Sequence, residues 1–180
     1  SGKAVPKMII DYCLLTAGTS VSGANMQSCQ FVLVGSADIK RKISLLRSGK
    51  GDFYADKAPL EWLQSLAPLG TDANKPFLER APWLIAVFPK RFGILEMEKG
   101  ETLLSAESVG IATGFQITAL HHAGLVCLTH IPSPMGFIIK ILQRPNTERP
   151  FLLLVVGYPD EGAKVPDIGK KLLDENATFV

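Results

Sequence analysis

Apolar and polar positions alternate along this chain with two distinct periods, which separate predicted helices from predicted strands. After Pro6, apolar residues recur every three or four positions, and Gly18 offers a stop, so an amphipathic helix is expected between them. Four short apolar runs predict buried strands: Phe31–Val34, Trp83–Phe88, Leu125–His130 and Phe151–Gly157. The chain after Tyr158 has no strong period.

Further helices are predicted between these strands, at Ala37–Arg47, Pro59–Leu66, Ser105–Gly124 and Ser133–Leu142. In the first of them, Ser36 is the expected cap, and Ile39, Ile43 and Leu46 are the expected inward residues. Residues 48–58 are polar and rich in glycine, which indicates a loop. Because helices and strands alternate around long irregular pieces, we expect an α+β or α/β sandwich built on one sheet.

The segment Ser105–Gly124 is the longest predicted helix and is apolar on nearly all sides. Gly110 and Gly114 lie four residues apart on it. Such a helix is expected to be deeply buried, with another backbone close by.

Composition and charge narrow the class of protein. The 180 residues are 47% hydrophobic and 20% charged with a net charge of +2, which fits one globular domain and argues against nucleic-acid or membrane partners. The apolar runs are far shorter than the roughly 20 residues of a spanning helix. Cys13, Cys29 and Cys127 lack metal-ligand spacing, so we expect no metal site, buried free thiols and a reducing, cytoplasmic compartment.

The stretch Thr19–Cys29, TSVSGANMQSC, is longer than a tight helix-to-strand turn needs. Its small residues would let the backbone lie close against something flat or charged. Other candidates are weaker. Adjacent His121 and His122 point in different directions on a helix, Glu107 fits a first helical turn, and His130 ends a strand.

Polar residues in the loops and the tail are individually ordinary. Tyr54 and Lys75 fall in polar loops and are expected at the surface. Lys164, Lys170 and Lys171 could bind a phosphate, or form a solvated basic tail. From these residues alone, the chain is a globular domain with a candidate ligand cradle.

The order of several motifs adds a resemblance that spans nearly the whole chain. The motifs are AGTSVSGANMQ, PFLERAPWLIAVF, ESVGIATGFQITALHHAGL, LTHIPSPMGF, LQRPNTERPFLLLVVGYP and KVPDIGKKLLDE. In this order and spacing they resemble the FMN-dependent nitroreductase family, and within it the branch that includes iodotyrosine deiodinase.

The resemblance implies an α+β sandwich with a mixed or antiparallel sheet in an intertwined homodimer, with FMN at the subunit interface. The flavin residues it implies are Ser22, Gly23, Ala24, Asn25, Thr129, His130, Ile131 and Lys170. Tyr54 and Lys75, with Ala24, match substrate-binding positions, and Leu172–Val180 matches an arm that embraces the other subunit. Residues 1–180 then form one nitroreductase-like domain.

The chain departs from the family pattern in four ways. The chain starts just after the place of an Arg-rich segment that grips the FMN phosphate. Lys50 stands where the deiodinase branch has a Glu that meets the substrate ammonium, which disfavours iodotyrosine. Ile131 replaces a Thr whose hydroxyl reaches the flavin and is associated with tuning its chemistry, and Ser28 and Cys29 replace Pro-Trp.

Three functions fit this pattern. The leading expectation is an NAD(P)H-dependent FMN oxidoreductase that reduces nitroaromatics, quinones or similar electron-poor compounds, with no side chain required as a nucleophile. A second is a catalytically degenerate dimer that acts as a binding or regulatory protein. A third is a reductive dehalogenase with a substrate other than iodotyrosine.

Overall fold

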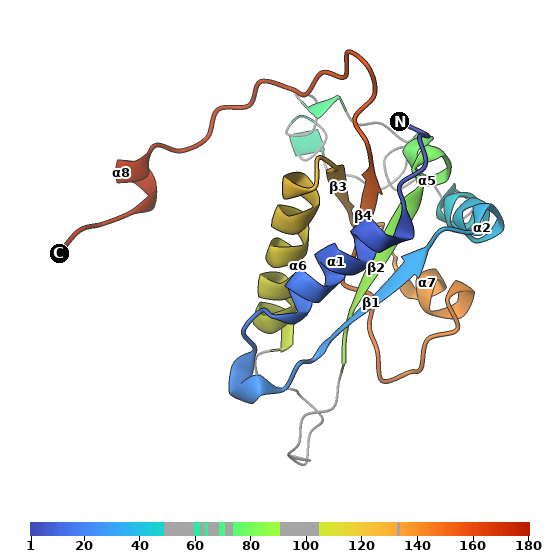
Figure 1. Ribbon diagram of the computed structural model, residues 1–180, viewed down its shortest axis with the longest axis horizontal. Coiled ribbons are helices and arrows are strands. Elements are labelled where there is room, and N and C mark those ends of the chain that lie inside the picture. The colour runs from blue at the N-terminus through green and yellow to red at the C-terminus, as the bar shows by residue number, and fades with distance from the viewer. Residues whose placement is uncertain (49–59, 62–63, 65–68, 71–73, 91–104, 133) are drawn as a thin grey trace.

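Four antiparallel strands form the centre of the chain in a computed structural model that describes residues 1–48, 60–61, 64, 69–70, 74–90, 105–132 and 134–180. Within these residues the sheet has the order β1-β2-β4-β3 (Figure 1). The strands are β1 (Cys29–Val34), β2 (Trp83–Pro89), β3 (Val126–His130) and β4 (Leu152–Gly157). All four predicted strands are confirmed, with ends shifted by one or two residues.

Strand β2 shows how the sheet divides the core into two layers. Its residue Val87 pairs with Phe31 of β1 and with Leu152 of β4. Because successive side chains of a strand point to opposite faces, Val87 enters one core cluster and its neighbour Phe88 the other. Both residues are fully buried, so β2 reads as a continuous apolar run.

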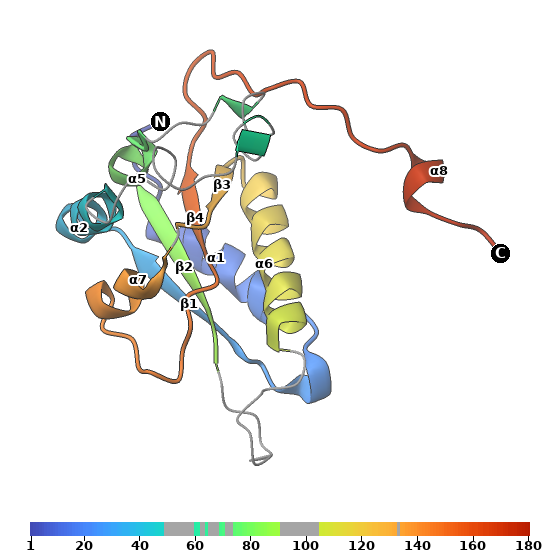
Figure 2. The ribbon, with the colours of Figure 1, turned by 180° about the vertical axis from the view of Figure 1, so that it is seen from behind.

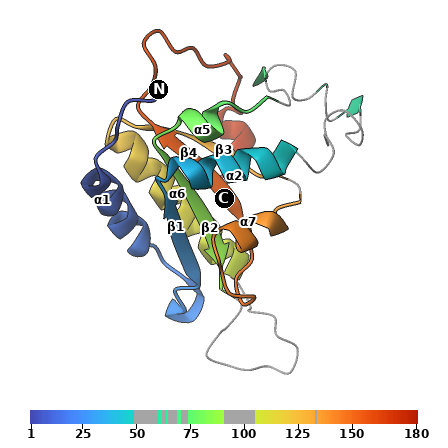
Figure 3. The same ribbon diagram turned by 90° about the vertical axis from the view of Figure 1, so that its right-hand side faces the viewer.

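Helices cover both faces of the sheet (Figures 1 and 3). One layer holds α1 (Lys7–Gly18) and α6 (Ser105–His122). The other holds α2 (Ala37–Ser48), α5 (Phe77–Arg80) and α7 (Gly136–Ile141). The predicted α+β sandwich is confirmed. The predicted helix at Pro59–Leu66 and the loop at 48–58 lie largely outside the described residues.

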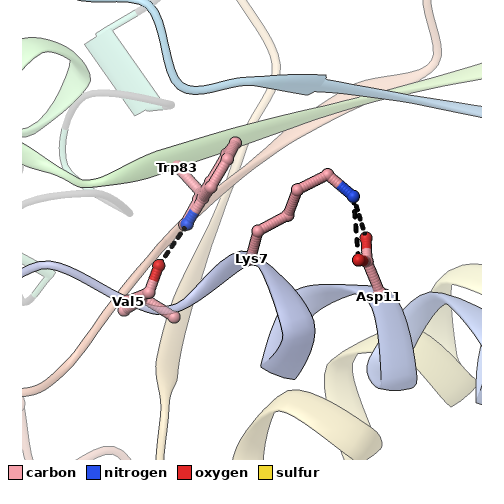
Figure 4. A network of polar contacts seen from close by, with 4 residues as sticks. All are labelled: Val5, Lys7, Asp11 and Trp83. Atoms are coloured by element: carbon pink, nitrogen blue, oxygen red, sulfur yellow. Dashed lines mark hydrogen bonds and ion pairs between the residues drawn. The ribbon is translucent and has the colours of Figure 1, made fainter.

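The first helix is tied to the sheet just before it begins (Figure 4). The indole Nε1 of Trp83 donates a hydrogen bond of 2.9 Å to the carbonyl of Val5. On the outer side of α1, Lys7 and Asp11 form an exposed ion pair, 2.6 Å between Nζ and Oδ1. Exposed pairs contribute little stability, so the Trp83 bond and the buried Ile10 hold this helix in place.

Helix α2 corrects one expectation. Ile43 is buried and Ser36 caps the helix by accepting a bond from the Ile39 amide, as predicted. Leu46, predicted to face inward, is 44% exposed, whereas Lys40 is only 7% exposed. The Lys40 Nζ donates a 2.7 Å bond to the carbonyl of Ala81, and burial lowers the pKa of this amine. The pattern of apolar positions gives no sign that a buried lysine will donate to the backbone carbonyl at the end of α5.

Helix α6 is buried on one face only. Val109 and Leu120 are fully buried against the sheet, but Ile111 and Phe115 are exposed. Both Gly110 and Gly114 look onto open space within this chain. The expectation of deep burial on all sides is therefore wrong for a single copy, in which the helix backbone that packs closely on α6 is that of α1.

The chain beyond β4 leaves the body of the molecule. Residues 159–180 are almost entirely exposed, and the short helix α8 (Leu173–Asn176) stands apart from the sandwich in both views (Figures 1 and 2). Leu172, Leu173 and Phe179 are exposed apolar residues on this segment. This segment buries too little apolar surface against its own chain to offset the conformational entropy lost when its position is fixed.

A fully buried amide in α6 generates a stability prediction. Neither amide atom of Gln116 has a hydrogen-bond partner in the described part of the chain, and the residue is 0% exposed. Since an unsatisfied buried amide costs about 1–3 kcal/mol, Gln116→Leu is expected to raise the free energy of unfolding by about that amount. Urea denaturation at fixed protomer concentration measures it. Gln30→Leu, at a half-buried amide that donates to the Phe31 carbonyl, is the control. A lower stability for Gln116→Leu would contradict this account.

The three cysteines generate a second prediction. All three thiols are free, Cys13 is buried, and Cys29 and Cys127 are half-buried. Burial raises the pKa of Cys29 to about 12, against a smaller opposing effect of Lys90, and burial also raises the pKa of Cys13 and Cys127. Because the thiolate is the reactive form, native protein near neutral pH should react with iodoacetamide far more slowly than protein in urea. Mass spectrometry of the labelled chains measures the rates; equal rates in both conditions would refute the assignment.

Candidate functional site

The loop between α1 and β1 has an unusual backbone. It contains the short 3₁₀ turn η1 (Gly23–Asn25). Ala24, Asn25 and Gln27 have φ values of 49°, 55° and 47°, in the left-handed region. Residues other than glycine pay about 1–2 kcal/mol for this conformation. Three such residues within four positions indicate a loop shape that the surrounding structure enforces.

Hydrogen bonds hold this loop both internally and from outside. The Gln27 amide donates 3.0 Å to Ser22 Oγ, and the Asn25 amide donates 3.0 Å to the Ser22 carbonyl. From outside, Ser108 Oγ on α6 accepts a 3.1 Å bond from the amide of Gly23. The result is a rigid turn that leaves Ala24 and Asn25 exposed.

The second predicted group of flavin residues lies where β3 ends. Thr129 is exposed, Ile131 is 66% exposed, and His130 is half-buried. The ring of His130 meets the ring of Phe77 edge to face, with 5.8 Å between centroids. Since β3 is an outer strand of the described sheet, its outward-facing backbone groups take no part in the described ladder.

These two groups lie at opposite edges of the sheet. The Ser22–Asn25 loop leads into β1, whereas Thr129–Ile131 ends β3, and two strands separate β1 from β3. With about 4.8 Å between neighbouring strands, the two edge strands are roughly 14 Å apart. Within one copy of the chain, the two groups therefore lie at separate places.

Lys75 corrects a further expectation. It was predicted at the surface of a polar loop, but it is only 4% exposed. Its Nζ lies 6.0 Å from the centroid of the Phe77 ring, which also contacts His130. The Phe77 ring thus contacts both Lys75, a predicted substrate residue, and His130, a predicted flavin residue. Tyr54 and Lys50 lie outside the described residues.

The remaining candidates are spread over the surface. Lys170 is exposed on the segment after β4, as are Lys164 and Lys171. Ser28, at one of the departures from the family pattern, is buried, and its carbonyl accepts a 2.8 Å bond from the Lys90 amide. Of the predicted flavin residues, the chain itself brings together Ser22–Asn25 and, separately, Thr129–Ile131.

An apolar groove runs between α1 and α6. Its volume is about 600 Å³. It is lined by Ile9, Tyr12, Cys13, Thr16, Phe115, Thr118, Ala119, His122 and Ala123. On the same helix, Ile111 is exposed, and Gly110 and Gly114 face open space within this chain.

Neither a cluster that could hold a metal ion nor a helix that could span a membrane occurs among the described residues. Among the described residues, no three His, Cys, Asp or Glu side chains gather in a way that could hold a metal ion. No helix in this described part is long and apolar enough to span a bilayer.

Comparison with known proteins identifies the class. Residues 1–158 match the model of the nitroreductase family. The chain belongs to this family and is an oxidoreductase of it, as its motifs predicted.

Individual relatives are more specific. The chain is 49% identical to an iodotyrosine deiodinase of Haliscomenobacter hydrossis, over 100% of this chain and 81% of that protein. It is 39% identical to the iodotyrosine deiodinase of Danio rerio, covering all of this chain but only 62% of the relative. Its fold matches a crystal structure of oxidised iodotyrosine deiodinase bound to FMN and 3-iodo-L-tyrosine, with a TM-score of 0.81, 26% identity, and 99% and 92% of the two chains covered.

Proposed function

We propose that this protein binds FMN at a homodimer interface and acts as a reductive dehalogenase of halogenated phenols. The left-handed Ser22–Asn25 loop carries the proposal, because it is an enforced backbone cradle at the position where the family binds flavin. The relatives named as iodotyrosine deiodinases favour dehalogenation over the nitroaromatic reduction that was the leading expectation from the sequence.

The residues present fit a flavin. Ser22, Gly23 and Ala24 carry no bulky side chain, so a ring system can approach the backbone of this exposed turn. Across the interface, the end of β3 offers exposed Ile131 and outward backbone groups. Lys170 supplies a positive charge for the FMN phosphate, although an ammonium lacks the bidentate geometry of arginine.

Bound FMN supplies the two electrons that, with one proton, replace the aromatic halogen by hydrogen and release halide. The role of the protein is to bind and orient the flavin and the substrate. Ile131 presents an apolar surface without a hydroxyl, so only backbone groups at this position can donate hydrogen bonds. Lys75, which the family resemblance matches to a substrate-binding position, is buried with its ammonium next to the Phe77 ring.

The substrate is proposed to be a halophenol without the amino-acid group. Lys50 would place a second positive charge near the ammonium of iodotyrosine, where the deiodinase branch has a Glu. The electron donor is proposed to be NAD(P)H, as expected from the family resemblance.

A turnover experiment tests this function. Protein titrated with FMN and reduced by dithionite without oxygen receives 2-iodophenol, 3-iodotyrosine or a nitroaromatic compound, and released iodide and reduced products are quantified. We expect FMN binding, iodide release from both iodinated compounds, and a roughly five- to thirtyfold higher kcat/KM for 2-iodophenol, since an unfavourable charge contact costs on the order of 1–2 kcal/mol. Nitroaromatic reduction without iodide release would replace this function by nitroreduction, and failure to bind FMN would favour a non-catalytic dimer.

A homodimer is proposed from the same geometry. The apolar face of α6, with Gly110 and Gly114, suits close packing against a second copy. The exposed apolar residues of the arm Leu172–Val180 would then be buried on that copy.

Removing residues 172–180 tests the arm. Because Leu172, Leu173 and Phe179 each expose much of their apolar side chain in one copy, their loss should weaken dimerisation by at least about tenfold. Sedimentation equilibrium over a range of protomer concentrations measures the dissociation constant. Replacing Lys164 and Lys171 by Gln, which leaves the apolar residues in place, is the control. An unchanged constant in the truncated chain would exclude the arm from the interface.

A further inference from the structure

A hydroxyl on α6 is the external hydrogen-bonding support of the left-handed loop. Ser108 is the fourth residue of α6, and its side chain is buried. Its Oγ accepts the Gly23 amide at 3.1 Å, across 85 positions in the sequence. Among the hydrogen bonds of the described residues, the others that stabilise the turn Ser22–Gln27 come from within the turn.

The bond from the Gly23 amide to Ser108 lies directly before the left-handed residues, where the backbone of the turn would otherwise change conformation. Ser22 is extended, with φ −139° and ψ 151°, and Gly23 begins the 3₁₀ turn whose next residue, Ala24, is left-handed. Fixing the Gly23 amide therefore sets the orientation of the peptide that precedes the strained residues. Without it, Ala24, Asn25 and Gln27 can return to the right-handed or extended regions that their side chains prefer.

Other polar residues of α6 do not share this arrangement. The hydroxyl of Thr113 donates 2.7 Å to the Val109 carbonyl, and that of Thr118 donates 2.9 Å to the Gly114 carbonyl. Both are local bonds to the preceding helical turn, which are common for Thr in helices. Ser108 instead connects the helix to a different element.

We propose that Ser108 is a positioning residue for the cofactor: it holds the Ser22–Asn25 turn in its binding shape through the Gly23 amide, and so sets FMN affinity without touching the flavin. The inference rests on the proposed FMN-binding function. It also links the cofactor turn to the helix proposed to form the dimer interface, so that the two features share one support.

Flavin titration of Ser108→Ala tests the proposal. Losing one hydrogen bond of ordinary strength should raise the FMN dissociation constant about fivefold, within a range of roughly twofold to twelvefold. Hydrogen exchange should become faster at the amides of residues 23–27. Thr113→Val, which removes a buried hydroxyl from the same helix without crossing to the turn, is the matched control and should leave both readouts unchanged.

A variant that lacks the donor, the Gly23 amide, tests the same hydrogen bond independently. Gly23→Pro deletes the amide hydrogen, and the extended Ser22 suits a residue that precedes proline. If the bond is the cause, Ser108→Ala has no further effect on FMN affinity in the Gly23→Pro background. If Ser108→Ala does not fold, the readout is hydrogen exchange at residues 24–27 of Gly23→Pro without FMN, which does not depend on how the proline ring meets the flavin.

The outcomes separate the two proposals. Wild-type protein that binds no FMN refutes the proposed function. Wild-type protein that binds FMN, with an unchanged dissociation constant and unchanged exchange in Ser108→Ala, refutes only the role of Ser108. An equal loss of affinity from Ser108→Ala in both backgrounds also refutes it.

Discussion

One helix that is apolar on both sides constrains the whole molecule. The sheet covers the face of α6 that carries Val109 and Leu120, and the opposite face with Ile111 and Phe115 is left open. A contiguous apolar face of this kind is costly in water, so a partner that covers it is favoured. The same helix contacts the strained turn through Ser108. Core packing, proposed assembly and cofactor geometry therefore all depend on where α6 lies.

Much of the fold could be predicted because it follows from local patterns. The runs Trp83–Phe88 and Phe151–Gly157 are apolar, β-branched or aromatic and short, and they became the two central strands. The predictions that failed concern residues whose burial is decided by a single polar contact. Lys40 is buried because its ammonium reaches the carbonyl of Ala81, and Leu46 is exposed in its place. A pattern of apolar and polar positions alone predicts a buried Leu46 and an exposed Lys40.

The candidate site was predicted in part for a similar reason. Motifs identify which segments bind flavin in the family, but they carry no information on distance. The sheet order separates Ser22–Asn25 from Thr129–Ile131, and only the fold shows this. Lys75 is buried although the sequence predicted an exposed position in a polar loop. Ser108 had no sequence signal, because a serine near a helix start usually needs no further explanation.

The central claim is that two copies of the chain complete each flavin site. Mixed dimers test it directly: Ala24→Trp blocks one half-site and Ile131→Glu the other, at two exposed positions. Each variant alone should bind no FMN. After the two are unfolded together and refolded, random pairing should restore roughly one quarter of the wild-type sites, because half the dimers are mixed and each mixed dimer has one intact site. No recovery of FMN binding, with mixed dimers shown to form, would contradict the account.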